Sequence, residues 1–229
     1  PGEIARSNTL ADNLRDASDH LPLIVEYQVP AVIAASMDGD VGRVLQSAIV
    51  IVDATIENGA NALVSSGADE LDYVVGGFGD VFGTGFGVIP ALGAPVVENF
   101  IVSTSTVGNL SGFVEVSSTS EGTGNPVSLP ITGEVVRHAA PSFSSSQDVT
   151  ETEIVWAVDT NTGTQTIDVD VFNFGFDAQQ ALLDVDGVQH VLGTAAFQSG
   201  LQAGIGAGSA ALTFEFDTDG VTPGTYGAE

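Results

Sequence analysis

Apolar residues recur at every second position in several short runs, and this spacing is the feature that most restricts the possible folds. In residues 21–29 the apolar side chains Leu21, Leu23, Val25, Tyr27 and Val29 fall on one face. A period of two places alternate side chains on opposite faces of a β-strand. Pro30 then ends the run or marks an edge strand. The pattern predicts a strand buried on one face.

Residues 48–52 break this rule, because they are continuously apolar and rich in β-branched residues. Such a run predicts a strand buried on both faces. Asn58-Gly59 is typical of a turn and would close the segment. A helix across residues 44–63, which contain several Ala, Leu and Gln, is the competing prediction.

Similar spacing predicts further strands at residues 99–107, 111–117, 132–137, 153–160, 164–176 and 210–217. Within 164–176 the apolar parity changes, from Val169 and Val171 to Phe172 and Phe174. A strand cannot change its buried face without an extra residue, so we expect a β-bulge near Val171-Phe172.

Turn residues separate these runs. The chain has 28 Gly, and residues 182–192 suggest a hairpin turning at Asp186-Gly187. Many short strands joined by Gly, Asn, Asp and Pro predict an all-β protein of the jelly-roll or β-sandwich barrel type. We expect this domain to cover residues 21–229, with a possible internal seam in the Ser-rich stretch 141–150.

A short helical arm is expected at residues 1–20. Thr9 and Asp12 have a spacing similar to a capping box within residues 7–19, and Pro22 follows the predicted helix. Its apolar stripe, Leu10 and Leu14, is narrow, which favours an arm on a neighbouring surface; a core helix is the competing prediction. We therefore expect Leu10 and Leu14 to contact a neighbouring subunit.

Charge restricts the environment and the partners. The chain carries 30 Asp and Glu against four Arg and no Lys, a formal net charge of −26. Binding of nucleic acid needs clustered cations, which this chain lacks. Self-repulsion of this size is screened at molar salt, where the Debye length is about 3 Å. The composition indicates a hypersaline environment.

Other features exclude further classes. The chain has no Cys, so a disulfide framework or a thiolate metal site is impossible. The sequence contains no stretch of 18 apolar residues, so no transmembrane helix is predicted. The chain opens Pro1-Gly2-Glu3, which favours a protein made without a cleaved signal peptide.

The Gly-rich segment 76–93 contains Phe78, Phe82 and Phe86. It matches neither the dinucleotide fingerprint nor the Walker pattern, so nucleotide binding is not expected. The alternation of Phe with Gly allows a membrane-inserting loop as one hypothesis. A connection buried at subunit contacts is the preferred one, because exposed apolar patches usually mark protein contacts.

No residue pattern indicates catalysis or a cofactor. Asp184-Val185-Asp186-Gly187 and Asp217-Thr218-Asp219-Gly220 fit turn chemistry, with a structural cation site as the alternative, because EF-hand ligands are lacking. His20, His138 and His190 form no metal-binding motif. We expect neither an enzyme nor a bound metal or cofactor.

In size, acidity, β content and expected unprocessed start, the chain resembles the single-jelly-roll major capsid proteins of internal-membrane icosahedral viruses of haloarchaea. The resemblance implies a self-assembling capsid subunit in a virion, whose partners are its own copies, other structural proteins of the assembly and a nearby internal membrane. A secreted haloarchaeal cell-surface or filament subunit with β-sandwich domains is the first alternative. A tail-tube protein of a haloarchaeal tailed virus is the second.

Overall fold

The computed structural model describes residues 12–13, 28–120, 126–187 and 202–226, and nearly all of its regular structure is β. These residues form fifteen strands and one 3-10 turn, Ser65–Gly67, so the all-β prediction is confirmed. Of the expected arm, only Asp12 and Asn13 are described; both are helical and exposed, and the rest lies outside the described residues. Within the described part, no helix is long and apolar enough to cross a membrane.

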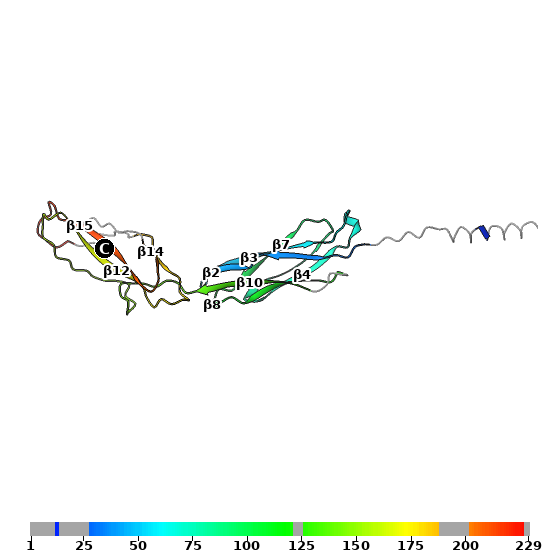
Figure 1. Cartoon of the computed structure of the whole chain (residues 1–229), viewed down its shortest axis with the longest axis horizontal. Helices are drawn as coiled ribbons and strands as arrows, with labels where there is room; N and C mark the ends of the chain where they lie inside the picture. The colour runs from blue at the N-terminus through cyan, green and yellow to red at the C-terminus, as the bar shows by residue number, and fades with distance from the viewer. Residues whose placement is uncertain (1–11, 14–27, 121–125, 188–201, 227–229) are drawn as a thin grey trace, which may run out of the picture.

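Two sheets pack face to face to form the first sandwich (Figure 1). One has the strand order β1-β3-β7-β5, built from β1 (Ile33–Met37), β3 (Val50–Asn58), β7 (Val96–Val102) and β5 (Val81–Phe82). The other has the order β2-β10-β9-β4-β6, built from β2 (Asp40–Leu45), β10 (Val127–Val136), β9 (Gly112–Ser118), β4 (Leu71–Gly79) and β6 (Thr84–Ile89). The short strand β8 (Gly108–Asn109) pairs with β10.

Chain direction alternates between neighbouring strands except at one place. Strand β2 runs parallel to β10, whereas the other strand pairs of this sandwich are antiparallel. The chain changes sheets between β1 and β2 at Asp38-Gly39. This step brings β2 beside the end of β10, where the first sandwich joins the rest of the molecule.

Period-two alternation supplies the core of the first sandwich, because the inward residues of each strand are apolar. The largest fully buried side chains there include Ile56 on β3, Leu71 and Val75 on β4, Phe100 on β7 and Val114 on β9. Facing sheets of this kind bury their inner faces against each other and leave the outer faces to solvent or partners.

A second group of sheets follows at the end of β10. Strands β11 (Pro141–Ser142), β12 (Thr164–Asn173) and β15 (Ser209–Asp217) form one antiparallel sheet, and β13 (Leu183–Val185) pairs with β14 (Gln202–Ile205). Their shared core is small and consists of Val171, Leu183, Ile205 and Leu212. In Figure 1 this second group lies end to end with the first sandwich, so the described body is elongated.

Two sequence predictions about strands were wrong in instructive ways. Residues 50–58 do form a strand, β3, and not a helix, but only one face of it is buried; Ile51 is exposed. The Gly-rich segment is not a loop, because residues 71–79 and 84–89 are the paired strands β4 and β6. Glycines can occupy strands where a neighbouring element approaches closely.

The β-bulge expected near Val171-Phe172 is absent from the pairing of β12 with β15. That pairing keeps one unbroken register from Thr164↔Asp217 to Phe172↔Ser209. The inward face continues from Val169 and Val171 to Asn173, a buried polar residue, so the strand needs no extra residue. The strand expected at residues 153–160 is also wrong, since those residues have no regular structure.

Candidate functional site: an arginine-clamped joint

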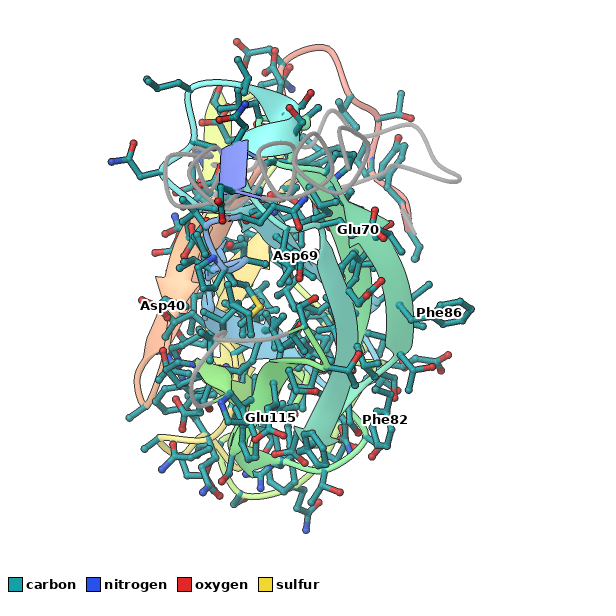
Figure 2. All side chains as sticks on the ribbon, turned by 90° about the vertical axis from the view of Figure 1, so that its right-hand side faces the viewer. Asp40, Asp69, Glu70, Phe82, Phe86 and Glu115 are labelled. Atoms are coloured by element: carbon teal, nitrogen blue, oxygen red, sulfur yellow. The ribbon has the colours of Figure 1, made fainter. Side chains whose placement is uncertain are left out.

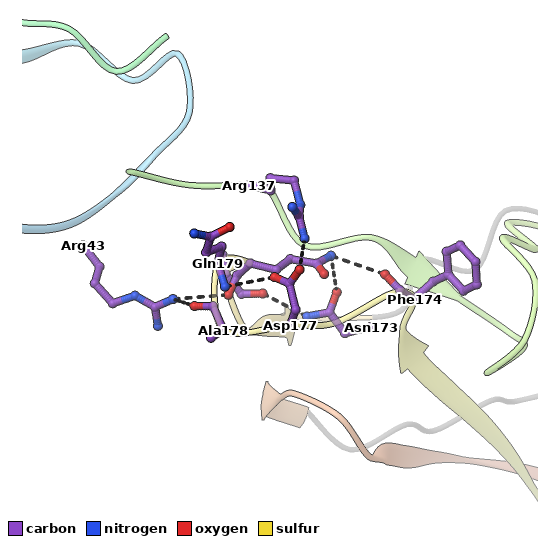
Figure 3. Close-up of polar contacts among 9 residues, drawn as sticks. Arg43, Arg137, Asn173, Phe174, Asp177, Ala178 and Gln179 are labelled. Atoms are coloured by element: carbon purple, nitrogen blue, oxygen red, sulfur yellow. Dashed lines mark hydrogen bonds and ion pairs between the residues drawn. The ribbon is translucent and has the colours of Figure 1, made fainter. Parts of the chain in front are cut away.

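The junction between the first sandwich and the second group of sheets is a network of hydrogen bonds around two arginines (Figure 3). Strand β10 ends at Val136 and β11 begins at Pro141, so only residues 137–140 connect the two parts. We call this connection, together with the facing residues 173–181, the joint. A connection of four residues can bend only if its backbone N–H and C=O groups are not held by hydrogen bonds.

Those backbone groups are not free. The Arg137 N–H donates to the Gln179 carbonyl (2.8 Å), and the Ala181 N–H donates to the Arg137 carbonyl (2.8 Å). Arg137 and Gln180 thereby form a parallel β-bridge. Further along, the Phe174 N–H donates to the Ala140 carbonyl (2.7 Å). The connection is therefore held along its length as an extension of a sheet.

Two guanidinium groups add contacts from both sides of the joint. Arg137 donates to the Asp177 carboxylate (2.6 Å). Arg43, on strand β2 of the first sandwich, donates to the Ala178 carbonyl (2.7 Å) and to the Gln180 carbonyl (3.5 Å). The Nε of Arg43 also lies 3.1 Å from Glu134 on β10. A planar guanidinium with several donors suits such a set of fixed oxygens.

These are the two arginines of the residues that the structure describes. The whole chain has only four basic residues, Arg6 and Arg15 being the others, against 30 acidic ones. An exposed ion pair contributes only about 0–1 kcal/mol to folding. The concentration of scarce cations at the joint therefore indicates a role in fixing geometry more than in overall stability.

Below the arginines lies a buried amide pair. The Oδ1 of Asn173 accepts from the Ala140 N–H (2.9 Å) and from the Gln180 side chain (3.0 Å), and its Nδ2 donates to the Ala181 and Ile205 carbonyls. Both Asn173 and Gln180 are buried. Because a fully satisfied buried network specifies one arrangement, these amides orient the turn that receives the arginines.

Asp177 is tuned by the same contacts. The hydrogen bond from Arg137, and after it the hydrogen bond from the Gln179 N–H, hold the pKa of the Asp177 carboxyl below its ordinary value. The carboxylate therefore stays ionised across neutral and mildly acidic pH, and its contact with Arg137 persists there.

A second polar contact ties the sheets of the first sandwich together. The Tyr73 hydroxyl on β4 donates to the Glu98 carboxylate on β7 (2.7 Å). A Cβ at Gly87 would lie 2.8 Å from the Tyr73 ring, and one at Gly85 would lie 2.6 Å from the Glu98 carboxyl carbon. Strand β6 therefore needs glycine at both positions to make room for this pair.

The residues predicted as assembly contacts fall on the outside of the first sandwich. Phe86 is 83% exposed on β6, and Phe82 is exposed on β5; Figure 2 shows both projecting from the same side. Phe78 on β4 is also exposed and stacks on Phe113 of the neighbouring β9, with ring centroids 5.0 Å apart. Leu10 and Leu14 lie outside the described residues. The three aromatic side chains are thus available for contacts, and their role in assembly stays a prediction.

The other candidate residues do not form a site together. His138 lies at the joint, where its Nε2 is 3.1 Å from the Gln46 carbonyl, while His20 and His190 lie outside the described residues. Asp184 accepts from the Gly204 N–H across the β13–β14 pair. Asp217 accepts from the Asp219 N–H in a local turn. Among the described residues, no group of His, Asp and Glu has the arrangement of a metal site.

No pattern along the chain indicated the joint. Arg43 and Arg137 are far apart in the chain and belong to no motif, and Asn173 was not singled out as a candidate residue. The one usable clue was the rarity of arginine in so acidic a chain. A guanidinium group in such a chain is expected to contact carbonyl or carboxylate oxygens.

Comparison with known proteins adds little. No protein-family model matches the chain, and no curated protein matches it. Among solved structures, the chain is similar to a protein of unknown function from Porphyromonas gingivalis W83, with 13% sequence identity and a TM-score of 0.29. That match covers 80% of this chain and 83% of the other.

Proposed function

We propose that this chain is a structural subunit of a cell-surface or extracellular filament assembly, in which β-sandwiches are joined end to end by fixed joints. The observation that carries the proposal is the joint itself. The four-residue connection is hydrogen-bonded along its backbone, and Arg43 and Arg137 hold the residues that face it. These contacts fix the orientation of the second group of sheets relative to β10. A chain built in this way acts as a stiff spacer or a segment of a rod.

The strand order supports this proposal. The order β1-β3-β7-β5 facing β10-β9-β4 matches the A-B-E-D and G-F-C sheets of an immunoglobulin-like sandwich, and β6 adds a further strand beside β4. Strand β2 then adds an edge strand parallel to β10. We interpret the first sandwich as immunoglobulin-like, which is the β-sandwich form of the jelly-roll or β-sandwich architecture expected from the sequence. Sandwiches of this architecture recur in many cell-surface domains.

The charge is compatible with an exposed position in a saline medium. The outer face of the β12–β15 pair carries Asp168, Asp170, Glu215 and Asp217 on neighbouring positions. Carboxylates this close repel one another unless salt screens them. A subunit bathed in concentrated salt meets that condition.

The experiment is immunogold electron microscopy and protease shaving of intact cells of the native organism, using an antibody against this chain. We expect gold label on the cell surface or on filaments, and loss of the protein on shaving. Label confined to the cell interior would overturn the proposal. Label on icosahedral particles would also overturn it and would favour the capsid-subunit expectation, which stays a prediction.

A further inference from the structure

Four exposed apolar side chains lie on the outer face of the β1-β3-β7-β5 sheet or, in the case of Ile49, directly before its strand β3. They are Ile49, Ile51, Phe82 and Ile101, which we call the apolar strip. Ile51 is the cross-strand partner of Ile101, and Ile101 is the partner of Phe82, so these three lie side by side across β3, β7 and β5. Ile49 is 88% exposed and the other three are each 58% exposed. Exposed apolar patches of this kind mark protein contacts.

The strip differs from its surroundings in charge. Its four residues are uncharged, and the next row of the sheet pairs Asp53 with Asn99, whose amide donates to the Asp53 carboxylate. The outer face of the β12–β15 pair, by contrast, presents four carboxylates. Electrostatic complementarity, and hence the choice of partner, differs between the two faces.

This difference in charge restricts the kind of partner that each face can bind. A basic partner would bind where the carboxylates gather and would gain nothing from an uncharged strip. A partner that carries the same charge of −26 can approach closely only where carboxylates are lacking. We propose that the apolar strip is the contact through which a second copy of this chain associates, with the two strips facing each other.

The layout of the strip fits the centre of such a contact. Stable interfaces bury about 800 Å² per partner and have an apolar centre inside a polar rim. The strip supplies the centre. Asp53 and Asn99 form the adjacent row of the sheet, and Ser103 follows the end of β7. In a symmetric pair, Ile101 on the middle strand lies nearest the twofold axis.

The contact has a distinctive salt dependence. Association of the strips buries apolar surface between two acidic molecules, so salt both strengthens the burial and screens the repulsion. Self-association should therefore increase with NaCl concentration. Binding of a basic partner would show the opposite dependence.

The chain has no Cys, which allows a direct test with the purified full chain. In dilute solution, an Ile101→Cys variant should react with a maleimide, because the strip is exposed in the monomer. At molar NaCl and higher protein concentration, with an added mild oxidant to take up the two electrons and protons lost by the paired thiols, it should form disulfide-linked dimers. Leu63→Cys, at an equally apolar and 97% exposed position away from the strip, is the matched control and should dimerise much less.

Analytical sedimentation of two double variants without cysteine measures self-association and completes the test. We expect Ile51→Ser with Ile101→Ser to weaken self-association by about tenfold or more, as truncation at the centre of an interface does. Leu63→Ser with Val64→Ser, which removes two exposed apolar residues elsewhere, should leave it unchanged. Circular dichroism checks that all variants keep their β signal.

Three outcomes would overturn the inference. They are equal dimer yields from the Ile101→Cys and Leu63→Cys variants, self-association that weakens as salt rises, and an Ile101→Cys thiol that is unreactive in the monomer because another part of the chain covers it. All three concern the purified protein. They are therefore separate from cell-surface location, which the labelling experiment decides.

Discussion

At the scale of single residues, the interior of the first sandwich contains one polar contact that depends on two glycines. The Tyr73 hydroxyl donates to Glu98, and Gly85 and Gly87 on β6 leave the space that the pair occupies. Any side chain at position 87 would contact the tyrosine ring. The short-range Gly pattern of this segment thus serves close packing and not chain flexibility.

Replacing Gly87 with Ala should lower the free energy of unfolding by about 1–3 kcal/mol, the usual cost of overpacking a filled site. The added Cβ would lie 2.8 Å from the Tyr73 ring and would displace it from Glu98. Gly208→Ala is the control, because a Cβ there meets no atom within 4 Å. Urea unfolding followed by circular dichroism measures both, and equal midpoints would contradict the prediction.

The same tyrosine predicts a loss of stability in alkali. Burial, and after it the hydrogen bond to Glu98 and the charge of Glu98, raise the pKa of Tyr73 from 10.0 to about 12. Between pH 10 and pH 12 the unfolded chain loses the hydroxyl proton while the folded chain keeps it. Stability from this contact is therefore complete below pH 10 and is lost as the pH rises through 12.

The measurement compares wild type with Tyr73→Phe by urea unfolding at pH 9 and pH 11.5. The variant leaves the half-buried Glu98 without its partner, which costs about 1–3 kcal/mol at pH 9. At pH 11.5 the difference between the two proteins should shrink. A difference that stays constant with pH would show that Tyr73 does not titrate as expected.

At the scale of elements, the joint decides whether the molecule is a rod or a pair of loosely tethered parts. Its ion pairs are exposed and add little to folding stability. They instead fix the orientation of the two parts, because Arg43 belongs to β2 of the first sandwich while the carbonyls that it binds belong to residues 178 and 180. Removing them should change the angle between the parts without unfolding either.

Arg43→Gln combined with Arg137→Gln should broaden the distribution of distances across the joint. Thr84 on β6 and Ala211 on β15 are both exposed and can be replaced by cysteine. Spin labels attached to the two cysteines report the distance between them by pulsed electron paramagnetic resonance. Glu134→Gln is the matched control, since it removes the ion pair of Arg43 and leaves its carbonyl contacts. An unchanged distribution in the double variant would mean that the backbone bonds suffice.

At the scale of the whole molecule, shape and charge act together. The two groups of sheets lie end to end in Figure 1, and the chain carries a net charge of −26. Self-repulsion on this scale opposes the compact state, and at molar salt the Debye length falls to about 3 Å. The form described here is therefore the one expected in concentrated salt.

Small-angle X-ray scattering at molar NaCl should give a radius of gyration well above the roughly 17 Å of a compact globule of this length. Dialysis to ~0.05 M NaCl, where screening extends beyond 10 Å, should loosen the fold or its assembly. Circular dichroism and light scattering follow this change. An unaltered β signal and particle size at low salt would contradict the inference of a hypersaline environment.

Alternation of apolar residues along the chain determined several of the strands, although residues 153–160, predicted in the same way, form none. Strands β9 and β15 lie within one residue of their predicted ranges, because a period of two has the same meaning in any β-protein. The acidic composition likewise determined the net charge. These properties belong to single segments or to sums over the chain, and neither depends on which elements meet.

Only the tertiary structure decided what covers each strand. Ile51 sits in an apolar run that suggested burial on both faces, yet no second layer reaches it in the described residues, because covering a face requires an element from elsewhere in the chain. Arg43 and Arg137 reach their partners in residues 177–180 only because β2 runs beside β10 at the end of the first sandwich. Asn173 could take an inward position only because Ala140, Gln180, Ala181 and Ile205 supply its hydrogen bonds. Contacts between residues distant in sequence follow from topology, and alternation along one strand carries no information about them.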